Sequence, residues 1–211
     1  MKPAVRVKIC GLTRSRDVRA AVSLGADAIG LVFARGSKRL VDADNARKLV
    51  KSVPAFVTRV GLFLDQDAGF VESILGRVSL SLLQFHGDEE ADFCRRFGLP
   101  YIKAVSMQSA QALADAQLAY PDAAGLLLDS HETGGLGGTG TVFDWNHIRQ
   151  GYLVEGRLPL VLAGGLTVGN VRQAVQQVKP WAVDVSSGVE DEPGIKNAVA
   201  MQKFIEEAKS E

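Results

Sequence analysis

The stretch "VRVKICGLTRSRDVRAAVSLGADAIGLVF", residues 5–33, contains the unit from which the fold is inferred. Residues 5–12 and 28–33 are short apolar runs typical of buried strands, and residues 15–25 between them have the spacing of an amphipathic helix. A strand, a helix and a second strand in this order predict two parallel strands joined by a right-handed crossover.

The same alternation continues along the chain. Further strands are expected at residues 56–64, 80–87, 101–107, 124–130, 158–166 and 182–189, and further helices at residues 42–53, 65–76 and 170–178. Strands that recur roughly every 25 residues, eight in all, favour closure of a parallel sheet into a barrel. The predicted fold is α/β, with residues 1–211 forming a single (β/α)8 barrel domain of eight parallel strands.

Composition excludes several classes of protein. The chain has 211 residues, of which 46% are hydrophobic and 23% are charged, which suits one globular domain with a well-buried core. No run approaches the roughly 18 consecutive apolar residues of a membrane helix, and the opening stretch "MKPAVRVKIC" contains no apolar signal core. The sequence therefore predicts a cytoplasmic protein without a membrane partner.

Charge and cysteine usage narrow the possible ligands. Lys and Arg number 24, and Asp and Glu also number 24, so no net field attracts nucleic acid, and an anion would have to be held by local geometry. The two cysteines, Cys10 and Cys94, form no CxxC pair and no histidine cluster accompanies them, so neither a metal site nor a disulfide is expected. Cys94 lies in a helical stretch and is expected to be inert packing.

The C-terminal ends of the strands are where barrel enzymes carry their active sites. Because side chains alternate along a strand, Lys8 and Cys10 share one face of the first strand, while Val7 and Ile9 share the other. The apolar face must contact the helices, so Cys10 is expected inside the barrel at its catalytic rim. Alternatively, Cys10 is a small core residue, as buried free thiols usually are.

Polar residues end two other apolar runs at the same height. Asp129 closes the strand at residues 124–130, and burying a carboxylate there is costly unless it is paired or protonated. Gln84 and His86 end the strand at residues 80–87 on one face. Asp129 could instead cap a helix or make a turn, and His86 could be a hydrogen-bonded structural side chain.

Glycines at the ends of the last two strands indicate the class of ligand. Gly164 and Gly165 precede a helix expected to begin near Val168, and Ser187 and Gly188 end the eighth strand. Glycines there let backbone N–H groups approach an anion closely, and the loops after strands seven and eight often bind phosphate in barrels. A phosphorylated small molecule is therefore the expected ligand, although glycines can also simply make tight turns. The glycine-rich residues 133–141 are interpreted as the loop after the sixth strand.

Seven segments, in order and spread over almost the whole chain, resemble the successive motifs of the phosphoribosylanthranilate isomerase family. They are "KICGLT", "SKRLV", "LQFHGDE", "LLLDS", "GGTGTVFDW", "LAGGLTVGNV" and "VDVSSGVE…GIKN". Two positions depart from the family pattern: Lys38 stands where proline is common, and Asn197 where aspartate is common. These departures bear on the shape of the Arg39 loop and on the start of the last helix.

The resemblance implies a (β/α)8 barrel that catalyses an Amadori rearrangement, the third step from chorismate in tryptophan biosynthesis. The substrate would be N-(5-phosphoribosyl)anthranilate and the product 1-(2-carboxyphenylamino)-1-deoxyribulose 5-phosphate. Opening the furanose needs an acid, assigned to Asp129, and removing the C2 proton of the resulting iminium needs a base, assigned to Cys10. Arg39 is assigned to the anthranilate carboxylate, because a guanidinium can bind it bidentately. The expected substrate site is completed by His86, Gly164, Gly165, Ser187 and Gly188, with no cofactor and no metal.

Two other classes of function remain open. A different phosphosugar enzyme on the same barrel, such as an epimerase or the related histidine-pathway isomerase, would share the phosphate loops, although the latter is expected to have aspartate in place of Cys10. A binding protein without catalysis would keep the glycines but have no reason to pair Cys10 with Asp129. Either a monomer or a homodimer is expected.

The first and last strands of a closed barrel are neighbours. In "AVDVSS", residues 182–187, Val183 and Val185 should face the helices, which turns Asp184 inward. Lys8 is inward on the adjacent strand, and a lone buried charge would be very costly, so Lys8 and Asp184 are predicted to pair beneath Cys10. The Lys8 ammonium is then expected to favour the thiolate of Cys10. The alternative has Lys8 in water at one barrel mouth and Asp184 capping a turn.

Overall fold

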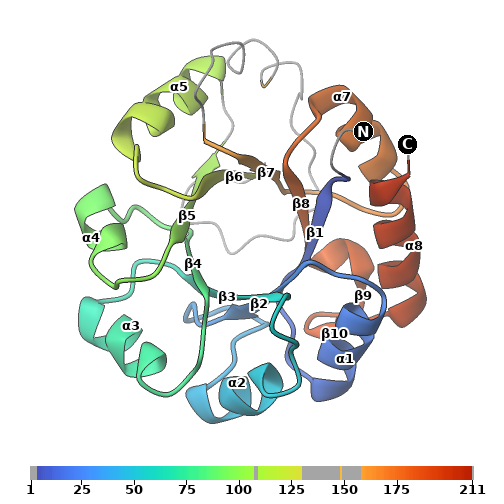
Figure 1. The fold of residues 1–211 in the computed structure, drawn as a ribbon, viewed down its shortest axis with the longest axis horizontal. Helices are drawn as coiled ribbons and strands as arrows, with labels where there is room; N and C mark the ends of the chain where they lie inside the picture. Colours follow the sequence, from blue (N-terminus) through green and yellow to red (C-terminus); the bar gives the residue numbers. More distant parts are fainter. Residues whose placement is uncertain (1–3, 107–108, 130–147, 149–157, 211) are drawn as a thin grey trace.

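The computed structural model describes residues 4–106, 109–129, 148 and 158–210. Strands β1 to β8 are all parallel and close into a barrel in sequence order, with β8 paired to β1 (Figure 1). The strands are β1 (Arg6–Ile9), β2 (Ala28–Val32), β3 (Thr58–Phe63), β4 (Leu82–Phe85), β5 (Tyr101–Ser106), β6 (Gly125–Asp129), β7 (Leu160–Leu162) and β8 (Ala182–Val185). This architecture confirms the predicted (β/α)8 barrel.

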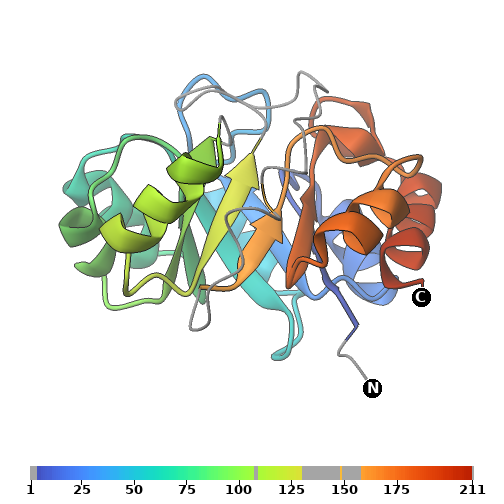
Figure 2. The same ribbon diagram turned by 90° about the horizontal axis from the view of Figure 1, so that it is seen from above.

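Helices surround the barrel on its outside (Figure 1). Those in the described residues are α1 (Ser15–Ser23), α2 (Ala43–Val50), α3 (Ala68–Leu75), α4 (Ala91–Arg95), α5 (Ala110–Ala119), α7 (Val171–Val178) and α8 (Ala198–Lys209). No helix among the residues described is long and apolar enough to cross a bilayer. Figure 2 shows the start of the described chain, in dark blue, on the side of the barrel opposite to the arrowhead of β6, so the strands run away from that side.

Two of the boundaries that differ from the sequence prediction have a clear local cause. Strand β1 ends at Ile9, earlier than the expected residue 12, because Gly11 has a φ of 73° and turns the chain out of the strand. Helix α7 begins at Val171 and not near Val168. There the Asn170 carboxamide oxygen accepts a hydrogen bond from the Thr167 backbone N–H at 2.8 Å, which holds residues 168–170 as a turn.

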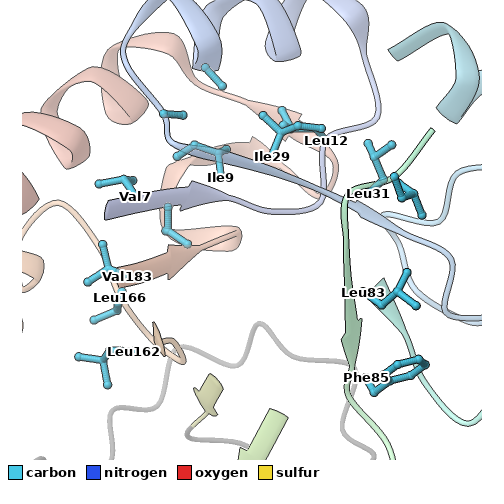
Figure 3. Close-up of a cluster of buried hydrophobic side chains, with 14 of the residues drawn as sticks. Val7, Ile9, Leu12, Ile29, Leu31, Leu83, Phe85, Leu162, Leu166 and Val183 are labelled. Carbon is cyan, nitrogen blue, oxygen red and sulfur yellow. The ribbon is translucent and has the colours of Figure 1, made fainter. Parts of the chain in front are cut away.

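The main hydrophobic core lies between the strands and the surrounding helices. Val7 and Ile9 of β1 and Val183 and Val185 of β8 belong to it, as the alternation of those strands predicts. Figure 3 shows Val7, Ile9 and Val183 among its members. This packing fixes the other face of each strand toward the barrel axis.

Side chains, and not solvent, fill much of the barrel interior. A second apolar cluster contains Ile102, Ala104, Leu127, Val161, Ala163 and Ala182. On the neighbouring strands β1 and β8, Lys8 and Asp184 are register partners whose charged atoms lie 2.9 Å apart. The predicted buried pair is therefore confirmed.

A short hairpin between β8 and α8 was not predicted from the sequence. After the single 3-10 turn η1 (Ser187–Val189), strands β9 (Glu190–Glu192) and β10 (Ile195–Lys196) pair antiparallel. Gly194 has a φ of 81° and makes the reversal possible. The hairpin lies beside α1 and α8 in Figure 1.

Candidate active site

A pocket opens at the C-terminal ends of the strands. Its lining includes seven of the residues predicted from the sequence: Cys10, Arg39, His86, Asp129, Gly164, Gly165 and Ser187. They come from strands and loops on both sides of the barrel, so the fold brings together residues far apart in the sequence. Asp184 also lines the pocket, from below Cys10.

Cys10 follows directly on β1 and is held there by its backbone. Its N–H donates to the Val185 carbonyl at 2.8 Å, which extends the β1–β8 ladder by one residue, and the side chain is 4% exposed. Gly30 of β2 faces it: a Cβ added to Gly30 would lie 2.7 Å from the Cys10 sulfur and 3.1 Å from Cε of Lys8. Absence of a side chain at Gly30 therefore makes the space that the thiol occupies.

The electrostatics of Cys10 differ in part from expectation. Burial raises the pKa of the thiol above its ordinary value, and the Asp184 carboxylate adds to the rise, while Lys8 and Lys196 act to lower it. Lys8 therefore favours the thiolate, as predicted. Burial outweighs this effect, so the net direction of the pKa is upward.

Lys8 and Asp184 form a buried ion pair. Lys8 Nζ is 2.9 Å from Asp184 Oδ1, and the two side chains are 5% and 9% exposed. Burial acts to lower the pKa of Lys8, but the charges of Asp184 and Cys10 raise it above its ordinary value. The ammonium therefore keeps its proton beneath Cys10.

Asp129 and His86 meet across the pocket from β6 and the end of β4. His86 Nε2 lies 3.4 Å from Asp129 Oδ2, and the Gln84 amide nitrogen lies 3.1 Å from His86 Nδ1. An amide nitrogen only donates, so a neutral His86 that accepts at Nδ1 carries its hydrogen on Nε2, the nitrogen nearer to Asp129. The predicted face shared by Gln84 and His86 is present, and Gln84 fixes the orientation of the ring.

Arg39 is not a free cation at the pocket wall. Its Nε and Nη2 donate to the Glu190 carboxylate at 2.9 Å and 2.7 Å, in a bidentate pair. These hydrogen bonds raise the pKa of Arg39 above its ordinary value. Nη1 donates to no other group in the described part of the chain, so the guanidinium retains one nitrogen for a further acceptor.

The glycine loops after β7 and β8 differ in what each glycine does. Gly164 and Gly165 have φ values of 75° and 65°, and within the described residues their backbone N–H groups donate to no partner. Ser187 begins η1, whose first N–H groups have no acceptor inside the turn. Three residues thus present backbone donors at one end of the pocket.

Gly188 does not line the pocket. A Cβ on Gly188 would lie 2.0 Å from the Leu166 carbonyl oxygen, so this glycine allows the loops after β7 and β8 to touch. The sequence analysis expected Gly188 at the substrate site, whereas its close neighbour in the structure is backbone and not pocket space.

A wider cavity, about 570 Å³, opens at the opposite mouth of the barrel. Among its charged lining residues, Asp27 accepts from the Val7 N–H and pairs with Lys209 at 2.9 Å, and Arg6 stacks on Trp181. Arg59 also lines this cavity, and its buried Nε has no hydrogen-bond partner among the described residues. Barrel enzymes carry their chemistry at the C-terminal face, and the thiol and the Asp129 carboxylate lie there. We therefore take the smaller pocket as the candidate site.

The chain is similar to known proteins over almost its whole length. A family model described as N-(5'phosphoribosyl)anthranilate (PRA) isomerase matches residues 7–207. The chain belongs to this isomerase family. A relative of that name from Pseudomonas aeruginosa (strain UCBPP-PA14) is 51% identical over 210 residues, which are 99% of this chain and 97% of the relative. A second, from Acidithiobacillus ferrooxidans, is 50% identical over 96% of this chain and 97% of its own.

Solved structures of PRA isomerases have the same fold. The crystal structure of the Thermotoga maritima enzyme is 39% identical, with a TM-score of 0.86 over 97% of this chain and 98% of that one. A PRA isomerase in complex with reduced 1-(o-carboxyphenylamino)-1-deoxyribulose 5-phosphate is 38% identical, with a TM-score of 0.83. The family assignment favours the isomerase over the epimerase and binding-protein alternatives.

The two departures from the PRA isomerase pattern leave the pocket intact. Lys38 is exposed, and the loop still places Arg39 at the pocket wall. Asn197 caps α8, its side-chain oxygen accepting from the Ala200 N–H at 2.9 Å, which is also what an aspartate would do. Glu190 and Lys196, two charged residues within the last family motif, were not predicted from the sequence as part of the site.

No group of three or more His, Cys, Asp or Glu residues with the geometry of a metal site occurs in the part of the chain that is described. The residues 133–141, interpreted as the loop after the sixth strand, lie outside the described residues.

Proposed function

We propose that this pocket converts N-(5'-phosphoribosyl)anthranilate into 1-(2-carboxyphenylamino)-1-deoxyribulose 5-phosphate, with Asp129 as general acid and Cys10 as general base. The reaction is the third step from chorismate in tryptophan biosynthesis. The observation that supports the proposal most is that a thiol and a carboxylate from non-adjacent strands, β1 and β6, line one pocket at the catalytic face.

Asp129 starts the reaction by protonating the ring oxygen. The C1–O bond then breaks, and the electron pair of the anthranilate nitrogen forms an iminium with C1. Asp129 is 8% exposed, and burial of a carboxyl group favours its protonated form, which can donate a proton. The His86 ring, 3.4 Å away, contacts the substrate on the same side and orients the acid.

Cys10 then continues the reaction by accepting the proton on C2. The positive iminium acidifies that proton, and the C–H electrons move to make a C1–C2 double bond, giving an enolamine. Tautomerisation places a proton on C1 and leaves a ketone at C2, so C2 is oxidised as C1 is reduced. Because this redox change is internal to the sugar, the reaction needs no cofactor.

The raised pKa of Cys10 affects both the strength of the base and the fraction of it that is deprotonated. A thiolate with a higher pKa is a stronger base but is less populated near neutral pH. The cationic iminium stabilises the thiolate when it is needed, and Lys8 acts in the same direction from below. Proton transfer between Cys10 and C2 is therefore favoured after the ring has opened.

The two ends of the substrate have separate receptors. The anthranilate carboxylate meets Arg39, whose Nη1 is available beside the pair with Glu190. The phosphate meets the backbone N–H groups of Gly164, Gly165 and Ser187. A phosphorylated small molecule is thus the ligand, no nucleic acid partner is proposed, and the protein acts as a monomer or homodimer.

The assay follows the loss of anthranilate-type fluorescence as substrate is consumed. Cys10→Ser and Asp129→Asn should each lower kcat by about 10² to 10⁴ without loss of fold, because each removes one proton-transfer group. Circular dichroism and the unfolding midpoint check the fold. Folded variants with turnover close to that of the unmodified protein would refute both roles.

Arg39→Ala tests the carboxylate receptor. It should mainly raise KM, and a ligand without the carboxylate should bind the variant as well as it binds the unmodified protein. Equal losses for ligands with and without the carboxylate would refute the assignment of Arg39.

A further inference from the structure

The β9–β10 hairpin places two charged side chains behind Arg39. Glu190 and Lys196 are register partners across the hairpin, and Lys196 Nζ lies 2.7 Å from Glu190 Oε1. Arg39 donates to the same carboxylate from Nε and Nη2. One carboxylate therefore lies between two cations at the edge of the pocket.

This cluster is buried. The side chains of Arg39, Glu190 and Lys196 are 12%, 4% and 0% exposed, respectively. Lys196 also donates to the Ser186 carbonyl at 3.0 Å and lies 3.3 Å from the Ser186 hydroxyl. Burial at this level makes the charges interact more strongly than a surface pair would.

Arg39 has little freedom within the cluster. A Cβ at Gly11 would lie 2.4 Å from Arg39 Cδ, so the stem of the arginine packs directly on the backbone that follows β1. The bidentate pair with Glu190 fixes the plane of the guanidinium at its other end. Backbone contact and carboxylate together determine where Nη1 lies.

The hairpin itself is tied to the rest of the barrel. The Thr13 hydroxyl donates to the Gly194 carbonyl at 2.6 Å, and the Lys196 backbone N–H donates to Asp17 of α1 at 3.2 Å. Gly194 in turn donates its N–H to Glu190 Oε1 at 3.2 Å. These contacts make Glu190 a fixed partner and not a mobile one.

We infer that Glu190 and Lys196 are positioning residues that make Arg39 a receptor for a carboxylate: Glu190 fixes the guanidinium, and Lys196 neutralises Glu190. The inference rests on the proposed function, in which Arg39 binds the anthranilate carboxylate. Two positive charges and one negative charge leave the cluster with one net positive charge. Without Lys196, Arg39 and Glu190 would form a neutral pair, which attracts a carboxylate weakly.

The pKa directions are consistent with this division of roles. Burial opposes ionisation of Glu190, but the hydrogen bonds of Arg39 and the charge of Lys196 lower its pKa below the ordinary value. Burial lowers the pKa of Lys196, and the charge and hydrogen bond of Glu190 act against that change. The net pKa of Lys196 is therefore below its ordinary value, with Glu190 acting to keep Lys196 protonated and Lys196 acting to keep Glu190 ionised. Arg39 is charged throughout.

The test compares two ligands on four proteins. The ligands are reduced 1-(o-carboxyphenylamino)-1-deoxyribulose 5-phosphate and the same molecule without the carboxyl group, and binding is measured by calorimetry. The proteins are the unmodified chain, Lys196→Met, Glu190→Gln/Lys196→Met, and Glu192→Gln as a control on an exposed position of the same strand. Unfolding midpoints are measured for all four.

Lys196→Met should weaken binding of the carboxylated ligand about tenfold or more, and change binding of the other ligand less than about twofold. The reason is that the carboxylate is the part of the ligand that contacts the Arg39–Glu190 pair, which is neutral in this variant. The double variant restores one net positive charge but no longer fixes Arg39. Its affinity for the carboxylated ligand should lie between those of Lys196→Met and the unmodified protein. Glu192→Gln should bind both ligands unchanged.

Equal losses for the two ligands in Lys196→Met would show a merely structural role and overturn the inference. Should that variant not fold, the double variant still decides, since binding of the carboxylated ligand as tight as in the unmodified protein would show that Glu190 does not position Arg39. Arg39→Ala separates this inference from the proposed function. One possible result is that Arg39→Ala weakens binding of the carboxylated ligand alone while Lys196→Met weakens binding of both ligands equally. In that case the role of Arg39 stands, and only the role of Lys196 and Glu190 is refuted.

Discussion

The ammonium of Lys8 lies 2.9 Å from the carboxylate of Asp184, inside the barrel and one inward-facing position before Cys10 on β1. The pair is held by register, since Lys8 and Asp184 are direct partners on β1 and β8. Its two charges act on the thiol in opposite directions: Lys8 lowers the pKa of Cys10 and Asp184 raises it. The balance between these two effects contributes to the fraction of Cys10 that is present as thiolate.

Replacing Lys8 should therefore move the pH dependence of the reaction. In Lys8→Met the carboxylate of Asp184 acts on Cys10 without the opposing charge of Lys8, and only Lys196 still acts to lower the pKa, so the pKa of the thiol rises further. A base must be deprotonated, so the ascending limb of kcat/KM should shift to higher pH, and the rate near neutral pH should fall. The pH profile of kcat/KM measures this shift.

The matched control is Lys8→Met/Asp184→Asn, in which both charges are removed and the limb should return toward that of the unmodified protein. Lys8→Met alone should also lower the free energy of unfolding by about 3 to 5 kcal/mol, because it leaves a buried carboxylate without its partner. An unshifted limb in a folded Lys8→Met protein would show that the pair does not influence the base.

The Lys8–Asp184 pair also shows which features of the structure could be predicted from the sequence. Alternation along β1 and β8, with the rule that the first and last strands of a barrel are neighbours, was enough to place Lys8 against Asp184. Both steps depend only on a period of two and on closure of the sheet. The same reasoning placed Cys10, His86 and Asp129 at one mouth.

The β9–β10 hairpin was beyond this reasoning for a physical reason. Its residues 190–196 are mostly polar and too few to show a period, so Glu190 and Lys196 look like solvated charges in the sequence. The "EPG" turn, residues 192–194, was the signal that could have indicated a reversal. The burial of Glu190 and Lys196 depends on contacts with Arg39 and α1, which no local sequence pattern encodes.

Gly188→Ala should separate the two loops of the phosphate receptor. The added methyl would lie 2.0 Å from the Leu166 carbonyl oxygen, which is backbone and cannot move aside at low cost. We expect the KM for the phosphorylated substrate to rise about tenfold or more and stability to fall by about 1 to 3 kcal/mol.

Gly169→Ala is the matched control in the same region, because its nearest neighbour would be the Thr167 hydroxyl oxygen at an ordinary 3.8 Å. It should leave KM and the unfolding midpoint nearly unchanged. Similar KM values for Gly188→Ala and Gly169→Ala would mean that contact between the loops is not needed for phosphate binding.

Gly30→Ala should displace the proposed base. The new methyl would lie 2.7 Å from the Cys10 sulfur and 3.1 Å from Cys10 Cα, and the latter atom belongs to the backbone. Misplacing a catalytic group by about 1 Å can cost about 10² in rate, so kcat should fall more than KM changes. Alkylation of Cys10 by iodoacetamide provides a second measure, since a displaced thiol should react at a different rate. Unchanged kcat would show that the space beside Gly30 is not needed by the base.

The last prediction concerns stability at alkaline pH. Cys94 on α4 is fully buried, with its sulfur 3.7 Å from the Glu89 carbonyl oxygen. Burial raises the pKa of this thiol to about 12, and the charge of Glu89 adds to the rise. In the unfolded chain the thiol ionises near its ordinary pKa of about 8.5. Between those two values the folded protein keeps a proton that the unfolded chain has lost.

The direction in which the free energy of unfolding changes with pH follows from the difference in bound protons between the folded and unfolded states. Where the folded state binds more protons than the unfolded state, the free energy of unfolding falls as pH rises, so Cys94 costs stability progressively above about pH 8.5. Tyr120 acts in the same sense, because burial raises its pKa to about 12 as well. Cys94→Ala removes one of these two groups, so its free energy of unfolding should decline less steeply with pH than that of the unmodified protein.

Urea unfolding of Cys94→Ala at about pH 7 and about pH 10.5 tests this expectation, because only the higher pH lies between the two thiol pKa values. At the lower pH the variant should be less stable by about 1 kcal/mol, owing to the lost sulfur, and the difference should shrink or reverse at the higher pH. Ile74→Val on α3 is the control, because it truncates a buried side chain that does not titrate and should cost the same at both pH values. A Cys94→Ala difference that stays as constant as that of Ile74→Val would show that Cys94 ionises no later in the folded protein than in the unfolded chain.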